Sequence, residues 1–302
     1  MINSMKDLVE KAKALETKTL VVAVANDHHV LEAIHMAKEA DIIRPILVGD
    51  QEAIKETLED LAIDLEGYEI VHVVSNVEAC EEAVKLVSQN DGYFLMKGYV
   101  DTAVILRAAL DKDYGLRTKN RISHVTVMEV PNYHKLLLMS DGAMNIDPDE
   151  DIKQEIIENA LVIAKAIGIT EPNVGIIAAI EKINPKMQAT LDAEALVVRN
   201  QKGQLTGCKV GGPFALDNAI NKEAAEIKGI TDPMAGDVDI LLMPQIESGN
   251  VFYKSMMFLA GAKSASVIAG ATKPIVLTSR ADSTESKFYS IALSALIADL
   301  KQ

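Results

Sequence analysis

Short apolar runs alternate with longer amphipathic segments over the first third of the chain. The run 19–25 is rich in Val and precedes a segment, 29–40, whose apolar side chains recur at helical spacing (Val30, Ala33, Ile34, Ala37). The same alternation predicts strands at 44–48, 70–74 and 92–96, and helices at 50–61, 77–87 and 102–110. Near-continuous apolar strands separated by helices are typical of parallel strands that are covered on both faces. The pattern therefore predicts a doubly wound α/β architecture.

The pattern changes near residue 121, where strands predicted at 122–130 and 135–139 are joined by the turn-forming pair Pro131-Asn132. This arrangement indicates a hairpin or a sheet extension, and a candidate domain crossing. The alternation then resumes, with helices predicted at 152–167, 187–198, 251–259 and 283–300, and strands at 174–179, 238–243, 265–269 and 275–278. A chain of 302 residues suits one large α/β domain or two of about 150 residues. Because no repeat or low-complexity linker separates the halves, we expect them to be closely joined.

The charge balance disfavours a nucleic-acid-binding protein. The chain carries 30 Lys and Arg against 44 Asp and Glu, a net charge of −14, whereas nucleic-acid binders need a basic face to displace counterions from phosphates. The N-terminal segment lacks the apolar core of a signal peptide, and the apolar stretch 256–270, interrupted by Lys263, is too short to span a bilayer. The two cysteines, Cys80 and Cys208, form no CxxC motif. We therefore expect a cytoplasmic protein without nucleic-acid or membrane partners.

The polar segment after the strand 275–278 offers groups that bind anions. Ligands of open α/β sheets bind outside the carboxyl ends of the strands, and here Ser279 and Arg280 precede a helix predicted to begin at Ser283. Helix N-termini carry partial positive charge, and Arg can grip an oxyanion through two hydrogen bonds. The alternative is a plain helix cap, with Ser283 as the N-cap and Glu285 favourable in the first turn.

Four further segments after strands carry glycines and polar side chains. They are Lys97-Gly98 with Thr102 and Arg107; Ser248-Gly249-Asn250 with Tyr253-Lys254; Gly211-Gly212-Pro213-Phe214 with Asp217; and Ser140-Asp141 with Asn145. Glycine allows the backbone to approach a ligand closely. Taken singly, each segment is explained as well by a strand–helix junction, a turn or a cap.

Several common catalytic motifs are missing from the sequence. No GxxxxGK[ST] phosphate loop and no GxGxxG fingerprint follows a predicted strand, which argues against nucleoside triphosphates and ordinary dinucleotide cofactors. There is no GxSxG nucleophile elbow. The six histidines have no metal-ligand spacing, and buried, inert thiols are the better expectation for both cysteines.

Taken together and in order, the segments resemble the phosphate acetyl/butyryl transferase family. The resemblance covers most of the chain and is strongest in the second half. Besides the segments above, it includes Leu259-Ala260-Gly261-Ala262 and Lys273-Pro274. The run Ser-Arg-Ala-Asp-Ser-x-Glu-Ser-Lys that starts at Ser279 is more similar to the butyryl branch than to the acetyl branch, which typically begins Ser-Arg-Gly-Cys.

The resemblance implies an α/β fold of two three-layer α/β/α domains, with mostly parallel sheets and a cleft between them, as in the isopropylmalate dehydrogenase-like fold. The first domain would comprise 1–121 plus 268–302, and the second 122–267. The implied reaction is reversible acyl transfer between coenzyme A and inorganic phosphate, with butyryl-CoA and phosphate giving butyryl phosphate and CoA by direct attack in a ternary complex. CoA would be a substrate, no cofactor would be tightly bound, and no metal is expected. A homo-oligomer, a dimer or larger, is implied.

The resemblance also assigns roles to particular residues. Arg107 and Arg280 would clamp the phosphate, and Ser279 with nearby backbone N–H groups would stabilise the carbonyl oxygen as it becomes an oxyanion. Substrate binding would involve Thr102, Arg107, Ser248, Gly249, Asn250 and Lys254. The acetyl branch usually carries an aspartate base seven residues after the serine, but this sequence has Ser286 there. The base therefore stays open between Glu285, which we place first, and Asp282.

Three other functions stay open. A phosphate acetyltransferase would share this mechanism, because acyl length depends on the shape of a pocket and one methylene discriminates by only about 1–3 kcal/mol. A metal-dependent decarboxylating dehydrogenase has a similar architecture and could use Asp141, Asp147 and Asp149, although a solvated acidic loop explains these residues well. A non-catalytic acyl-CoA-binding module would bind without turnover.

Overall fold

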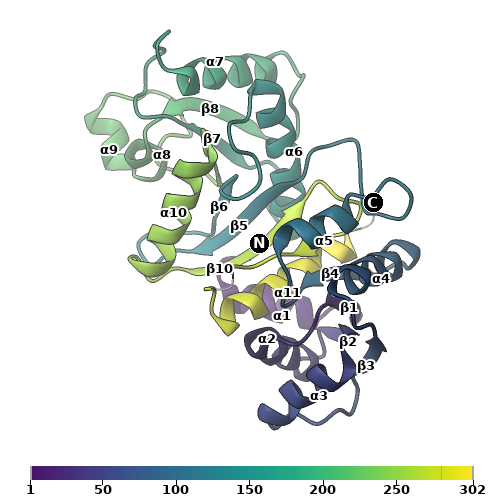
Figure 1. Ribbon diagram of the computed structural model, residues 1–302. Coiled ribbons are helices and arrows are strands. Elements are labelled where there is room, and N and C mark those ends of the chain that lie inside the picture. Colours follow the sequence, from purple (N-terminus) through teal and green to yellow (C-terminus); the bar gives the residue numbers. More distant parts are fainter. Residues whose placement is uncertain (1, 280, 301–302) are drawn as a thin grey trace. The chain divides into compact units, whose positions relative to one another are not determined.

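The computed structural model describes residues 2–279 and 281–300, and the chain divides into two compact units. The terminal unit contains Met5–Asn120 and Ala265–Gln302, and the middle unit contains Met1–Ser4 and Arg121–Ser264 (Figure 1). The chain therefore leaves the terminal unit once and returns to it. The domain boundaries expected from the sequence, 1–121 with 268–302 and 122–267, stay a prediction.

The strands of the terminal unit lie in the order β3-β2-β1-β4-β11-β10. Their bounds are β1 Lys18–Ala23, β2 Ile43–Gly49, β3 Glu69–His72, β4 Tyr93–Lys97, β10 Lys263–Ala269 and β11 Ile275–Val276. All neighbours are parallel except β10 and β11, which are antiparallel. Five of the six residues of β1 are buried, as are four of the five of β4. This burial is the physical origin of the apolar runs in the sequence.

The terminal unit has six helices among its described residues. They are α1 Met5–Lys13, α2 His28–Glu39, α3 Gln51–Asp60, α4 Asn76–Gln89, α5 Thr102–Ala109 and α11 Thr284–Asp299. Of these, α2, α3, α4 and α11 pack against the strands. Helix α11 packs with α1 and α2, and α4 packs with α5 (Figure 1). From Lys287 to Leu296 every residue of α11 is buried, which is typical of a helix enclosed in a core.

The middle unit has the strand order β5-β6-β9-β7-β8. The strands are β5 Ser123–Glu129, β6 Leu137–Ser140, β7 Asn173–Ile177, β8 Lys209–Phe214 and β9 Ile240–Leu242. The antiparallel pairing of β5 with β6 shows the hairpin, one of the two arrangements expected there, and the other neighbours are parallel. The helices are α6 Glu150–Ala166, α7 Gln188–Gln201, α8 Leu216–Ile220, α9 Lys222–Ile227 and α10 Ile246–Phe258. The mostly parallel strands of both units, which belong to one 11-stranded sheet, confirm the predicted α/β class.

Two local predictions were wrong in the middle unit. The Gly-Gly-Pro-Phe segment, expected to follow a strand, belongs to β8 itself, whose place at the end of the strand order makes a proline tolerable. The helix expected over 251–259 begins five residues earlier, at Ile246. Ser248, Gly249 and Asn250 therefore lie at the start of α10 rather than in a loop before it.

Among the described residues, none of the helices has both the length and the apolar character that a membrane span requires.

Candidate functional site

In the terminal unit, polar loops follow three neighbouring parallel strands. Strands β1, β4 and β11 are adjacent and parallel, so their carboxyl ends meet at the same edge of the sheet. The loop after β4 lies on the loop after β1, because the N–H groups of Gly98 and Tyr99 donate to the carbonyls of Ala23 and Val24 at 2.9 and 2.7 Å. A Cβ atom at position 98 would lie 2.1 Å from the Val24 carbonyl oxygen. Only glycine allows the two loops to approach this closely.

Ser279 lies in a tight turn at this edge of the sheet. Its N–H donates to the Asp282 carboxylate oxygen Oδ2 at 2.7 Å, and its carbonyl accepts from the Asp282 N–H at 3.1 Å. The Ala281 N–H donates to the Ser279 hydroxyl oxygen at 3.3 Å. That bond uses a lone pair of the hydroxyl and not its proton, so the Ser279 O–H can still donate. The Ser279 N–H, in contrast, is already used within the turn.

The N-terminus of α11 follows this turn and carries the two candidate bases. Ser283 is the N-cap of the helix, because its hydroxyl oxygen accepts from the Ser286 N–H at 3.1 Å, which confirms the capping interpretation. Glu285 is exposed and accepts a hydrogen bond from the Tyr289 hydroxyl at 2.6 Å. Asp282 is half-buried and is tied to Ser279. Arg280, the predicted phosphate clamp, lies outside the described residues.

Helix α5 separates the two residues that were predicted to act together. Thr102 is its first residue, at the carboxyl end of β4, whereas Arg107 is exposed in the last turn. Thr102 and Arg107 are five positions apart, and a helix turns by about 100° per residue. Their side chains therefore point about 140° apart around the helix axis. The structure therefore places Thr102 at the sheet edge and does not bring Arg107 onto the same face.

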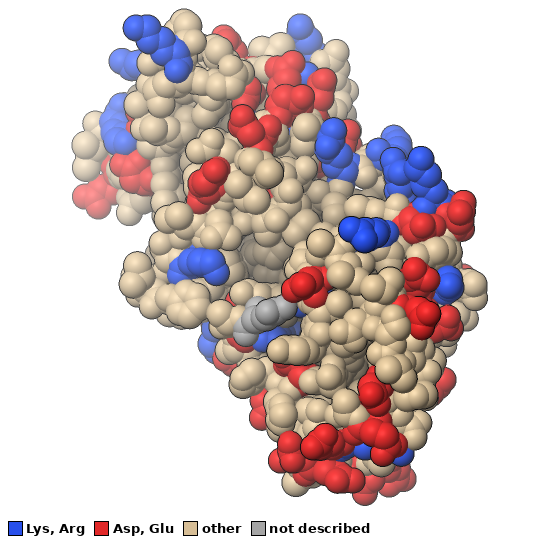
Figure 2. All heavy atoms as spheres, in the orientation of Figure 1, with Lys and Arg blue, Asp and Glu red and all other residues tan. Residues whose placement is uncertain are grey.

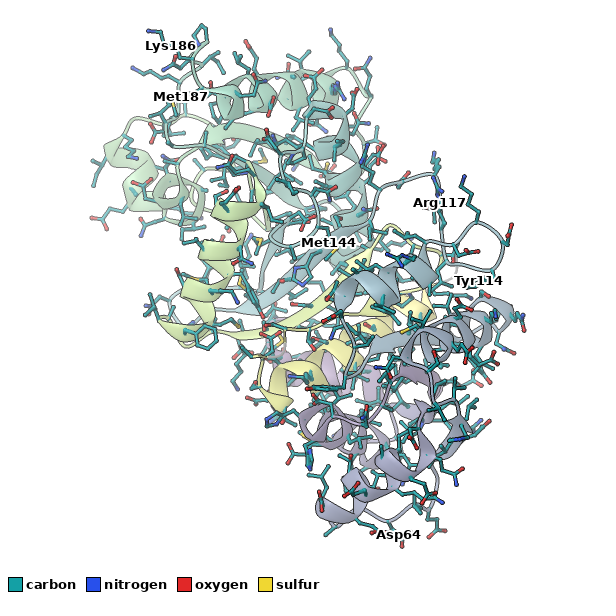
Figure 3. All side chains as sticks on the ribbon, in the orientation of Figure 1. Asp64, Tyr114, Arg117, Met144, Lys186 and Met187 are labelled. Carbon is teal, nitrogen blue, oxygen red and sulfur yellow. The ribbon has the colours of Figure 1, made fainter. Side chains whose placement is uncertain are left out.

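In the middle unit, the loop after β6 packs against the first turn of α10. A Cβ atom at Gly249 would lie 2.4 Å from the Asp141 carbonyl oxygen, and the Asn250 side-chain amide donates to the Gly142 carbonyl at 3.2 Å. The Asp141 carboxylate accepts the backbone N–H groups of the next loop residues, up to Asn145. Met144, labelled in Figure 3, belongs to this loop. The predicted segments Ser140-Asp141 and Ser248-Gly249-Asn250 are thus in direct contact.

The polar residues of α10 fall on different faces of the helix. Asn250 and Lys254 are exposed and four residues apart, so they share a face. Gly249 and Tyr253 are buried. The Ser248 hydroxyl donates to the Gln245 carbonyl at 2.8 Å, within the first turn. Asn250 and Lys254 are therefore the exposed polar groups of α10 among the predicted residues.

Asp217 belongs to a charge cluster that sequence reasoning missed. Lys228 on the loop after α9 lies 2.6 Å from Glu181 and 2.9 Å from Asp217. Hydrogen bonds from Lys228 hold the pKa of both carboxyls below their usual values. Because Glu181 and Lys228 are distant in sequence and stand in no motif, only the fold reveals the cluster.

The remaining titratable groups give little sign of other chemistry. Within residues 2–279 and 281–300, no group of three His, Cys, Asp or Glu side chains could hold a metal ion. Burial raises the pKa of Cys80 and of Cys208 to about 11, so both thiols are expected to be unreactive at neutral pH, in line with the sequence.

In the face shown in Figure 2, acidic side chains gather over the α3 and β3 end of the terminal unit. One missed polar group is Asn26, after β1, whose buried Oδ1 has no hydrogen-bond partner among the described residues.

Comparison with known proteins identifies the family. The family model "Phosphate acetyl/butaryl transferase" matches residues 4–84 and 75–295. A phosphate butyryltransferase of Clostridium beijerinckii is 45% identical over 298 residues, 99% of each chain. A phosphate acetyltransferase of Thermotoga maritima is 45% identical over 294 residues, 97% of this chain and 99% of the relative.

A solved structure supports the same assignment. The crystal structure of a branched-chain phosphotransacylase from Enterococcus faecalis superposes with a TM-score of 0.84 and 31% sequence identity, over 94% of this chain and 99% of that one. The ordered segments around Ser279, Ser248 and Lys97 had predicted this relationship. The chain is therefore an acyltransferase that belongs to the phosphate acetyl/butyryl transferase family.

Proposed function

We propose that the chain transfers an acyl group reversibly between coenzyme A and inorganic phosphate, with butyryl-CoA and phosphate giving butyryl phosphate and CoA. An oxygen of phosphate attacks the thioester carbonyl carbon; the C–O bond forms, the C–S bond breaks, and the departing thiolate takes up a proton. The observation that carries the proposal is the Ser279 turn at the carboxyl end of β11, in a chain that is 45% identical to a phosphate butyryltransferase.

Ser279 is proposed to stabilise the oxyanion that forms on the carbonyl oxygen. Its hydroxyl proton is not used by the Ala281 N–H, which donates to the oxygen of the same hydroxyl. A donor that is already oriented acts on the charge that develops in the transition state. Arg107 and Arg280 are proposed to bind the phosphate, each charge-assisted hydrogen bond contributing about 1.5–3 kcal/mol.

Glu285 is the better of the two proposed bases. The residue is exposed and its carboxylate accepts from the Tyr289 hydroxyl at 2.6 Å, whereas Asp282 is half-buried and its carboxylate closes the Ser279 turn through the Ser279 N–H at 2.7 Å. Glu285→Gln should therefore lower kcat without loss of stability, and Asp282→Asn should lower both. The opposite pattern would make Asp282 the base.

Substrate binding is proposed to involve Thr102, Arg107, Ser248, Gly249, Asn250 and Lys254. Thr102 is the first residue of α5, at the carboxyl end of β4, and the partial positive charge of a helix N-terminus favours an anion. Asn250 and Lys254 present an amide and an ammonium on one exposed face of α10. Phosphate and the phosphates of CoA are anions of the kind these groups bind. CoA is proposed as a substrate rather than a bound cofactor, and the reaction as one without metal.

A homo-oligomer in the cytoplasm is also proposed. Val251 and Phe258 on α10 and Leu259 at its C-cap are large apolar side chains that are 65%, 64% and 85% exposed, and such exposure favours a subunit contact. Sedimentation velocity should show a dimer or larger, and Phe258→Ser with Leu259→Ser should shift it toward monomer. A monomeric wild-type protein would contradict this proposal.

The free thiols of Cys80 and Cys208 agree with the proposed reducing compartment.

The decisive experiment measures the phosphate-dependent release of free thiol from butyryl-CoA, with acetyl-CoA alongside. The buried cysteines contribute little background, because their thiols are largely protonated at assay pH. Faster release from butyryl-CoA supports the proposal. Faster release from acetyl-CoA supports a phosphate acetyltransferase, which the equally similar relative from Thermotoga maritima favours. Binding without release from either would overturn both.

Variants of two serines test the site itself. Ser279→Ala should lower kcat by about 10²–10³-fold, the usual effect of removing one oxyanion donor. Ser283→Ala is the matched control, because it removes the N-cap of α11, costs about 1 kcal/mol of stability and leaves the oxyanion donor in place. Equal activity of the two variants would remove Ser279 from the mechanism. Arg280→Ala should raise the phosphate requirement or abolish turnover.

A further inference from the structure

Lys287 is a buried lysine in the helix that follows the Ser279 turn. It is the fourth residue of α11 and only 3% exposed, at the start of the fully buried part of this helix. A buried ammonium is costly unless hydrogen bonds replace its water. An apolar residue would serve packing better at this position, so the charge requires another explanation.

The hydrogen bonds of Lys287 are made to the turn that carries Ser279. Its Nζ donates to the backbone carbonyl of Asp282 and lies 3.5 Å from the carbonyl of Ser279. These two residues are also joined to each other, since the Ser279 N–H donates to the Asp282 carboxylate and the Asp282 N–H donates to the Ser279 carbonyl. Lys287 therefore adds, from α11, contacts to a turn whose two ends are also bonded to each other.

The charges of two carboxylates act on the ammonium. Burial lowers the pKa of Lys287, while the charges of Asp282 and Asp27 oppose that effect. Asp27 belongs to a different element, the N-cap of α2 after β1. Helix α11 packs against α2, so its lysine and the Asp27 cap of α2 belong to neighbouring elements of the terminal unit.

We propose that Lys287 is a positioning residue that holds the Ser279 turn in the geometry that reaction requires. The proposal rests on the proposed role of Ser279. Lys287 itself is enclosed, so it acts through the backbone of the turn and not by contact with substrate. Without the ammonium the turn keeps its internal hydrogen bonds but loses the contacts from Lys287, and the Ser279 hydroxyl is held less firmly in direction.

The test compares Lys287→Met with a matched control, Lys18→Met. Lys18 Nζ lies 2.7 Å from Asp299 at the far end of the same helix, with its side chain 12% exposed. Because oxyanion stabilisation exists only in the transition state, Lys287→Met should lower kcat by about 10–100-fold and change the KM values for acyl-CoA and phosphate by less than about threefold. Lys18→Met should lower the urea midpoint and keep the wild-type kcat.

A double-mutant cycle separates positioning from general destabilisation. If Lys287 acts through Ser279, Lys287→Met should lower kcat further by less than about threefold when Ser279 is already Ala. Full additivity, an unchanged kcat in Lys287→Met, or an equal loss in Lys18→Met would overturn the proposal. An active Ser279→Ala variant would instead overturn the proposed role of Ser279. Should Lys287→Met fail to fold, Lys287→Gln keeps a donor without the charge and is measured in the same cycle.

Discussion

Replacing Gly98 by alanine tests how closely the two loops at the carboxyl edge of the terminal unit must approach. A Cβ atom there would lie 2.1 Å from the Val24 carbonyl oxygen, whereas ordinary contacts begin at 3.4 Å, so the loop must move by about 1.3 Å. That movement breaks the two hydrogen bonds to Ala23 and Val24 at 2.9 and 2.7 Å. With about 0.5–1.5 kcal/mol for each bond and 1–3 kcal/mol for overpacking, the loss is about 2–6 kcal/mol.

The same displacement should reduce activity. Thr102 follows this loop, and a shift of about 1 Å in a group that orients substrate can cost about 10²-fold in rate. Urea unfolding gives the loss of stability, and phosphate-dependent thiol release gives kcat. Gly92→Ala is the control: this glycine has φ +75°, lies at the opposite end of β4 and has open space around it. It should cost about 1–2 kcal/mol through backbone strain alone and keep kcat. Equal stability and equal kcat in the two variants would refute the steric argument.

Two further changes probe charge pairs in the middle unit. Lys153→Met leaves the buried carboxylate of Asp192 without its opposite charge, although Gln188 still donates to it at 2.7 Å; the side chains of Lys153 and Asp192 are 3% and 5% exposed. Urea unfolding should show a loss of about 3–5 kcal/mol, and a loss below about 1 kcal/mol would contradict the pairing. Lys228→Met should cost stability at pH 6 and nothing at pH 2. The reason is that Lys228 lowers the folded-state pKa of Glu181 and Asp217, so its stabilisation is present above the usual carboxyl pKa of about 4 and is lost as pH falls through the folded values. If the stability of Lys228→Met differed from that of the wild type by the same amount at every pH, the stabilisation by Lys228 would not depend on the ionisation of Glu181 and Asp217.

The sequence predicts those elements of the fold that are determined by a local pattern of residues. Strands β1, β2 and β4 were predicted within one or two residues, because strands buried on both faces leave continuous apolar runs. Ser283 was predicted as a helix cap, because a capping side chain and its N–H partner lie three residues apart. The family was predicted from the order of segments that are weak singly.

The errors arise where a contact between distant residues determines the structure. Ser248-Gly249-Asn250 is a turn-forming sequence, but the glycine is needed because Asp141 and Gly142 lie against α10, so the helix begins earlier than its composition predicts. The strand β8 contains Gly-Gly-Pro, and its pairing with β7 overrides a sequence that disfavours strands. The burial of Lys287 was missed for the same reason, since no spacing in the sequence shows that its ammonium meets the turn before the helix.

The departure from the acetyl branch at Ser286 changes which group can act as a base. The Ser286 hydroxyl accepts a hydrogen bond from Ser283 at 3.2 Å, inside the cap of α11. Of the two neighbouring carboxylates, Asp282 closes the Ser279 turn and Glu285 is exposed. Phosphate is already an anion when it attacks acyl-CoA, so this step does not need a strong base. The main task of the turn is then to fix the direction of the Ser279 hydroxyl. This is why we assign the buried interactions around the turn, those of Asp282 and Lys287, to orientation, and leave proton transfer to the exposed Glu285.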